Sequence, residues 1–261
     1  MFHSSICAAF LAIICVVPSY SLVMADEDGQ KRIVMLVAER EYDTDQSLKA
    51  FAGQYLQDYK TTIVLADTDD RNSLSGIEAL ETADLMVVSV RRRTLPKDQL
   101  DRIRDFVKSG KPVIGLRTAS HAFSLRGKPA PKGRAGWPEF DAQVFGGNYT
   151  NHHGNSLQTS IELPEKTSGE TSSILAGIRS ALPAPSGGSL YRVSPLAANA
   201  NVLLIGRVPG AEAEPVAWTF IRKDGGKSFY TSLGHTEDFG GPVLPKLLKN
   251  AIQWSLAGDA E

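Results

Sequence analysis

Largely apolar runs of strand length alternate with amphipathic segments along the first half of the chain. The predicted strands cover residues 32–38, 62–66, 84–90 and 113–116. Such runs are typical of strands covered on both faces of a sheet. Between the runs, apolar residues recur with helical spacing, which predicts helices around residues 48–56, 77–80 and 100–107. Alternation of this kind predicts a parallel sheet built from right-handed crossovers.

The fourth predicted strand leads directly into a polar elbow at residues 117–121. Gly110 follows the preceding helix at the position of a left-handed C-terminal cap. A helix, a tight turn, a strand and a polar elbow place reactive side chains at the carboxyl edge of an open parallel sheet. We therefore expect the functional site at this edge.

The second half of the chain is less regular. Residues 124–136 form a loop rich in glycine, proline and basic residues, which we expect to be a functional lid or disordered. A short helix is predicted at 137–145 and a closing helix at 243–256, with strands at 156–163, 190–193, 202–207, 215–221 and 228–233. The turn Asp224-Gly225-Gly226 predicts a hairpin between the last two strands. The expected fold is a single α/β domain, with an open, mostly parallel sheet flanked by helices and added antiparallel strands.

The N-terminal segment differs from the rest in composition. An apolar run at residues 6–17 and the small-residue ending Val23-Met24-Ala25 predict a signal peptide at 1–25, although no basic residue precedes the run. Residues 26–261 would then form one exported domain, in the periplasm or outside the cell. The alternative is a retained anchor, and we expect membrane contact only through this segment if it stays uncleaved.

Composition excludes several kinds of site. Cys7 and Cys15 both lie in the predicted signal peptide, so the mature chain would have no disulfide, thiolate metal site or cysteine nucleophile. The formal net charge is −1 and no basic tail is present, so nucleic acid is not an expected partner. Gly115 lacks the glycine-rich dinucleotide fingerprint, so no nucleotide cofactor is expected.

Four histidines of the mature chain stand at the ends of predicted elements, where ligands of parallel sheets bind: His121, His152, His153 and His235. His235 follows a strand, and Glu237 lies two residues on, so the pair would act as general base and orienting partner. Alternatively, Glu237 only begins the approach to the last helix, and the alternative role for any single histidine is a structural hydrogen bond.

The elbow residues suggest further roles. Arg117 cannot be a nucleophile because it stays protonated, but it would hold an anionic or carbonyl oxygen. His152 and His153 are adjacent, so in extended backbone only one of them would enter the site. A divalent metal held by His121, by His153 or its neighbour, and by His235 is an alternative, although no close-spaced ligand motif is present.

Charged and aromatic residues follow two other strands at the same edge. Residues 91–93 are three arginines, of which we expect two on a solvated face, and Arg92 is the candidate for binding substrate oxygens. Glu41 and Tyr42 follow the first strand and would supply an acceptor and a ring that stacks on a sugar. Their alternative roles are a helix cap and a core aromatic.

These motifs together resemble the ThuA-like (trehalose utilisation) family, whose fold is similar to that of class I glutamine amidotransferases and flavodoxin. The resemblance rests on six segments spread over nearly the whole mature chain: residues 39–44, 91–96, GLRTASHAF at 115–123, WPEF at 137–140, FGGNYTNHHG at 145–154 and FYTSLGHTEDF at 229–239. Where those amidotransferases have the elbow Gly-x-Cys, this chain has Arg117, whereas His235 and Glu237 keep their His-x-Glu pair. The resemblance therefore implies a carbohydrate-linked role and excludes glutamine hydrolysis through a thioester.

The leading hypothesis is an exported protein that carries out acid–base chemistry on a carbohydrate, such as trehalose or a keto sugar. The expected catalytic residues are His235, Glu237 and His121, and the expected substrate-binding residues are Glu41, Tyr42, Arg92, Arg117, His152 and His153. The alternatives are a non-catalytic carbohydrate-binding domain and a metal-dependent hydrolase.

Overall fold

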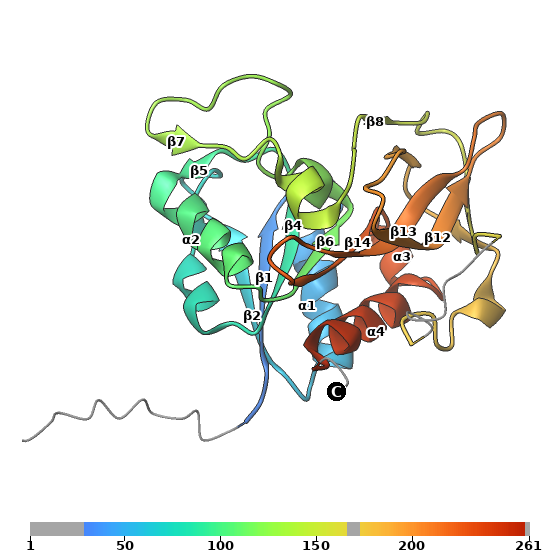
Figure 1. The fold of residues 1–261 in the computed structure, drawn as a ribbon, viewed down its shortest axis with the longest axis horizontal. Coiled ribbons are helices and arrows are strands. Elements are labelled where there is room, and N and C mark those ends of the chain that lie inside the picture. The colour runs from blue at the N-terminus through green and yellow to red at the C-terminus, as the bar shows by residue number, and fades with distance from the viewer. Residues whose placement is uncertain (1–28, 166–172, 259–261) are drawn as a thin grey trace, which may run out of the picture.

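The computed structural model describes residues 29–165 and 173–258, and the predicted signal peptide lies outside these residues. Within them, one ten-stranded sheet runs through the molecule in the order β10-β9-β12-β13-β14-β6-β4-β1-β2-β3, with helices on both faces (Figure 1). This mixed sheet confirms the predicted fold class. No helix in the described ranges is long and apolar enough to cross a membrane.

Five neighbouring strands of the sheet are parallel and form its scaffold. They are β2 (Lys60–Ala66), β1 (Arg32–Ala38), β4 (Leu85–Val90), β6 (Val113–Leu116) and β14 (Lys227–Thr231). Their spatial order reverses direction between β1 and β4, because β2 lies on one side of β1 and the later strands lie on the other. Ligands of open α/β sheets bind at the carboxyl ends of the strands beside such a reversal.

Helices cover both faces of the parallel strands. On one face lie α1 (Thr44–Tyr55), α3 (Thr236–Phe239) and α4 (Leu244–Leu256), and on the other lie α2 (Lys97–Lys108) and η1 (Ile77–Thr82) (Figure 1). Ile33, Met35 and Val37 pack into the core shared with α1 and α4. Val34 and Leu36 pack into the core shared with α2. Burial on both faces explains why the strand sequences are continuously apolar.

Antiparallel strands extend the sheet beyond β14. They are β13 (Glu214–Ile221), β12 (Ala200–Arg207), β9 (Thr159–Glu162) and β10 (Ala184–Ser186), while β3 (Leu74–Ser75) borders the opposite edge. The predicted hairpin between β13 and β14 is confirmed. Its turn uses Gly225 at φ 83°, and the Asp224 carboxylate accepts the Gly226 backbone N–H at 2.8 Å.

Some segments differ from the sequence prediction. β11 (Tyr191–Arg192) does not join the main sheet but pairs with β8 (Asn151–His152) in a two-stranded ribbon. The predicted helix at 137–145 is a single wide turn, η3 (Asp141–Phe145), which ends at Gly146 with φ 63°. The remaining short elements are η2 (Arg117–His121), η5 (Arg179–Ala181), β5 (Leu95–Pro96) and β7 (Arg134–Ala135).

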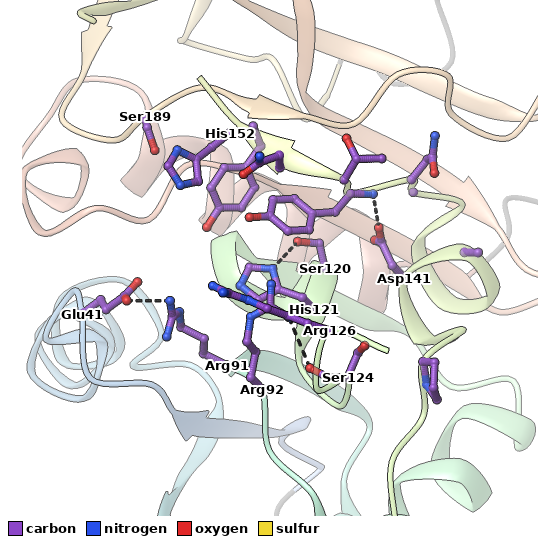
Figure 2. Close-up of a pocket in the computed structure, with 18 of the residues that line it drawn as sticks. Glu41, Arg91, Arg92, Ser120, His121, Ser124, Arg126, Asp141, His152 and Ser189 are labelled. Atoms are coloured by element: carbon purple, nitrogen blue, oxygen red, sulfur yellow. Dashed lines mark hydrogen bonds and ion pairs between the residues drawn. The ribbon is translucent and has the colours of Figure 1, made fainter. Parts of the chain in front are cut away.

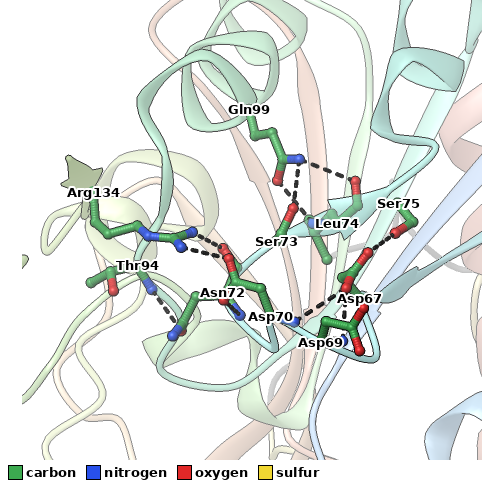
Figure 3. A network of polar contacts seen from close by, with 10 residues as sticks. All are labelled: Asp67, Asp69, Asp70, Asn72, Ser73, Leu74, Ser75, Thr94, Gln99 and Arg134. Carbon is green, nitrogen blue, oxygen red and sulfur yellow. Dashed lines mark hydrogen bonds and ion pairs between the residues drawn. The ribbon is translucent and has the colours of Figure 1, made fainter.

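The long loop at 124–136 is tied to the scaffold near its end, where β7 pairs with β5. Arg134 binds the Asp70 carboxylate and donates to the Asn72 carbonyl at 3.1 Å (Figure 3). Gln99 of α2 joins the same network by donating to Ser73 Oγ at 3.0 Å. This end of the predicted lid is therefore an anchored connection.

Candidate functional site

A cavity of about 830 Å³ lies at the carboxyl ends of β1, β4 and β6. Its floor comes from the loops that follow these strands, which carry Glu41, Tyr42, Arg91, Arg92, Ser120 and His121. The opposite wall comes from the segment between residues 138 and 155 together with Ser189 and Tyr191 (Figure 2). The cavity thus occupies the edge that the strand pattern predicted for ligands.

Arg117 holds the elbow beneath this floor. It follows β6 with a left-handed φ of 40°, and its side chain is buried. Its guanidinium donates to the Ser232 carbonyl at 2.9 Å and lies 4.5 Å from the Tyr42 ring and 4.8 Å from the Tyr191 ring. Arg117 therefore stacks between two tyrosines and orders the floor, rather than lining the cavity.

His121 is a buried residue of the cavity floor. Its Nδ1 lies 3.1 Å from Ser120 Oγ, and its ring stacks on Tyr149 with the centroids 4.4 Å apart. Burial, reinforced by the positive charges of Arg92 and other nearby arginines, lowers the pKa of His121 from 6.5 to about 2. The imidazole is consequently neutral at any physiological pH.

Glu41 and Arg91 form an ion pair across the cavity floor, with Glu41 Oε1 and Arg91 Nη2 2.7 Å apart. Glu41 does not cap α1, because it is Glu39 whose carboxylate accepts the Thr44 backbone N–H at 3.1 Å. Arg92 also lines the cavity, whereas Arg93 is buried outside it. The solvated face expected for two of these arginines is therefore wrong for Arg93, while Arg91 is half-buried in its ion pair with Glu41.

The two adjacent histidines separate as an extended backbone requires. His152 lines the cavity, and its Nδ1 lies 2.7 Å from the His153 carbonyl oxygen. His153 is not part of the wall, and its buried Nε2 has no hydrogen-bond partner within the described chain.

His235 and Glu237 lie outside the wall of this cavity. The His235 ring contacts the Tyr42 ring at a centroid distance of 5.5 Å. Its Nδ1 accepts the backbone N–H of Glu237 at 3.4 Å, so the ring serves as the N-terminal cap of α3. The Glu237 carboxylate lines a smaller neighbouring hollow of about 280 Å³. The predicted catalytic pairing of this histidine with Glu237 stays a prediction.

Asp238, which the sequence did not single out, holds the loop around His235. Its Oδ2 accepts the backbone N–H groups of Gly234 and His235 at 2.9 and 3.0 Å. Its Oδ1 accepts the Ser186 hydroxyl and the Gly187 N–H at 2.8 and 2.9 Å. The carboxylate therefore joins the start of α3 to β10.

The described residues contain no group of three His, Cys, Asp or Glu side chains that could hold a metal ion. The trio of His121, His153 and His235 is therefore not assembled as a metal site in this fold.

Asp141 and Arg126 are among the cavity residues that the sequence prediction missed. Burial raises the pKa of the Asp141 carboxyl from 3.8 to about 7, although its Oδ2 accepts the Tyr149 backbone N–H at 2.8 Å. Its Oδ1 has no partner among the described residues. The sequence does hold a signal that could have identified Asp141. Its carboxylate lies in a segment whose apolar residues, Phe140, Val144 and Phe145, face inward.

Left-handed backbone conformations gather at this site. Within the described ranges, the non-glycine residues with positive φ are Asp43, Arg92, Arg117 and Arg126, at 48°, 50°, 40° and 53°. Such a conformation costs roughly 1–2 kcal/mol for a residue other than glycine. Arg92 and Arg126 line the cavity, Asp43 follows its floor residue Tyr42, and Arg117 lies directly beneath. Strain concentrated in this way marks a functional site.

Comparisons with known proteins agree with this architecture. The model of the family ThuA, described as trehalose utilisation, matches residues 32–255. A putative ThuA-like protein from Bacteroides uniformis superposes with a TM-score of 0.59 and 17% identity, covering 90% of this chain and 95% of its own. One from Parabacteroides merdae gives a TM-score of 0.57 and 15% identity, covering 88% and 91%.

A search among curated proteins gave no match. At such low identities, the two solved structures establish the fold, while the family model extends over almost the whole described chain. The chain belongs to the ThuA family, which is described as trehalose utilisation and so belongs to carbohydrate metabolism.

Proposed function

We propose that the cavity at the carboxyl edge binds a sugar and that the protein catalyses proton transfer on it. The observation that carries this proposal is the composition of the wall. Neutral hydrogen-bonding side chains and tyrosine rings line the same cavity: Ser120, Ser124, Asn148, Thr150, Asn151, Asn155, Tyr42 and Tyr149. Sugars are bound by such a combination, because hydroxyls need donors and acceptors while the faces of the ring pack on aromatics. The volume of about 830 Å³ falls in the range of small-molecule sites.

His121 is the residue that we propose to polarise a sugar oxygen. A neutral imidazole donates a hydrogen bond to a carbonyl oxygen without first losing a charge, as in enzymes that stabilise enediolates. In this assignment the single Ser120 hydroxyl proton turns from the Arg117 carbonyl, 3.3 Å away, to His121 Nδ1, 3.1 Å away, and Nε2 keeps its proton. The lowered pKa of about 2 supports the neutral form. His152, in the opposite wall, is a second ligand for sugar oxygens.

The test is hydrogen exchange at carbon. The purified protein is incubated in heavy water with keto sugars, and proton NMR follows deuterium incorporation beside the carbonyl. Loss of the polarising residue in His121→Gln should slow exchange roughly 100-fold or more. His153→Gln is the matched control, since His153 lies outside the wall. Exchange by His121→Gln at the wild-type rate would show that the assignment is wrong.

The same measurement tests the predicted pair His235 and Glu237. If His235 transfers the proton, His235→Gln loses exchange while still binding the sugar. An unchanged rate in this variant removes His235 from the proposed chemistry.

A non-catalytic sugar-binding role is the second candidate. It is favoured by the contact between His235 and the backbone N–H of Glu237, since the expected acid–base pair does not face the cavity. Sugar binding in calorimetry with no exchange and no product for any sugar tested would decide for this role.

We also propose that the protein is exported. The apolar run and the small residues that end at Ala25 support this proposal.

A further inference from the structure

The cavity carries an excess of positive charge. The residues that line it include the arginines Arg91, Arg92 and Arg126 and the carboxyl groups of Glu41 and Asp141. Glu41 is already paired with Arg91. Asp141 offers little compensation, because burial raises its pKa to about 7. Two cationic groups, Arg92 and Arg126, are therefore left without a matching anion among these residues.

Neither of these two arginines has a carboxylate partner in residues 29–165 or 173–258. Arg92 Nη1 makes one long hydrogen bond, 3.4 Å, to the Ser124 carbonyl, while its buried Nε has no hydrogen-bond partner. Arg126 is exposed at the cavity. Burial, followed by the positive charge of Arg126, lowers the pKa of Arg92. The two like charges are thus close enough to repel each other.

The backbones that carry these two side chains are strained. Both residues have left-handed backbones, where an asparagine or a glycine would be less strained. Figure 2 shows Arg92 and Arg126 beside the His121 ring, on the same side of the cavity. They come from two different loops, one after β4 and one after η2. Two strained loops thus place two guanidinium groups on the same side of the cavity, near His121.

We propose that the ligand of this cavity is an anionic sugar, whose carboxylate or phosphate group is held between Arg92 and Arg126. The inference rests on the proposed function, because it names the class of sugar that the same cavity takes. Guanidinium groups bind carboxylate and phosphate oxygens through paired hydrogen bonds, and neither Arg92 nor Arg126 has a carboxylate partner among the described residues. The sugar ring then lies toward Tyr149 and Tyr42. Because His121 is neutral, it adds no charge, and the bound anion is the counterion of Arg92 and Arg126.

The experiment is calorimetric titration of the whole protein with glucose, glucuronate, glucose 6-phosphate and inorganic phosphate at two salt concentrations. An anionic sugar should bind at least tenfold more tightly than glucose and should weaken as salt increases. Arg126→Gln and Arg92→Gln should each lose this tenfold advantage, measured within each variant as the ratio of the affinity for the anionic sugar to the affinity for glucose. Arg207→Gln is the matched control, because Arg207 is a surface residue of β12 paired with Glu162, away from the cavity.

The outcomes separate the two proposals. Equal affinity for glucose and the anionic sugars overturns the anion inference and leaves the sugar-binding function standing. Binding of inorganic phosphate that needs Arg126, with no binding of any sugar, supports the anion site and overturns the sugar-binding function. Absence of binding by all four compounds overturns both. A preference for glucuronate over glucose 6-phosphate, or the reverse, identifies which anionic group the arginines hold.

Discussion

Burial acts in opposite directions on the pKa values of His121 and Asp141, two residues of the same cavity. It disfavours the charged form of each, so the histidine pKa falls from 6.5 to about 2 and the aspartate pKa rises from 3.8 to about 7. The stability contributed by neutral His121 is present above pH 6.5 and is lost as the pH falls toward 2. The stability contributed by protonated Asp141 is present below pH 3.8 and is lost as the pH rises through 7.

Between pH 3.8 and 6.5 the two effects offset each other. Each changes the free energy of unfolding by about 1.4 kcal/mol per pH unit, and the two changes have opposite signs. The summed contribution of the two residues to the free energy of unfolding is consequently nearly independent of pH in the mildly acidic range. Both residues affect the free energy of unfolding in this range. A substitution of one of them therefore reveals the pH dependence that the other contributes.

The substitution Asp141→Asn makes this dependence measurable. At about pH 8 the variant should be more stable than the wild type by a few kcal/mol, because it removes a carboxylate that is charged and buried. Near pH 3 the difference should vanish, since the wild-type carboxyl is then protonated in both states. Urea unfolding at several pH values measures it, with the exposed Asp105→Asn of α2 as control. A variant less stable than the wild type at the higher pH would contradict the prediction.

At the scale of an element, β6 depends on a glycine for close packing rather than for an unusual φ. A methyl group at Gly115 would lie 2.5 Å from Phe145 Cζ and 2.8 Å from Tyr230 Cδ2. These rings belong to η3 and β14, so the glycine lets both pack against the strand that carries the elbow.

Gly115→Ala should therefore destabilise the fold by about 1–3 kcal/mol, the usual cost of overpacking. Gly53→Ala is the matched control, because Gly53 lies in α1 with nothing within 4 Å of the added methyl. The control should be more stable than the wild type by about 0.5–1 kcal/mol, as expected for alanine in a helix. Thermal unfolding of both variants provides the comparison, and equal melting temperatures would refute the packing argument.

The elements that sequence patterns predicted well are those whose burial is uniform. β1 was predicted at its observed bounds, because residues 32–38 are covered on both faces. β11 was predicted as a strand but not as part of a separate ribbon, since its partner His152 lies about forty positions earlier. Local sequence indicates that Tyr191 is extended, but the choice of partner depends on contacts distant along the chain.

At the scale of the whole molecule, topology decided which site residues could be foreseen. Glu41, Tyr42, Arg92 and His121 follow strands of a parallel sheet, so their convergence follows from strand direction. Asp141 and Arg126 reach the wall through irregular segments whose paths no periodicity specifies. His235 also follows a strand, but it caps α3 behind Tyr42, and only packing determines this position.

Export is a property of the whole chain and has a direct test. If residues 1–25 are a signal peptide, the mature protein recovered from outside the cytoplasm begins at Asp26. Mass spectrometry of the intact protein identifies this terminus, with a version that starts at Asp26 as the control retained inside the cell. A full-length mass in the membrane fraction would instead support the retained anchor.

The cavity draws its floor from the parallel strands and its opposite wall from the segment that leads into β8, together with Tyr191 of β11. The floor is fixed by the scaffold, whereas the wall is assembled from irregular chain. Within the family, exchange of the wall alone would change which ligand shapes are admitted and leave the histidine and arginine of the floor untouched. Relatives that share this architecture can therefore differ in the ligand shapes that they admit while they keep the same reactive residues.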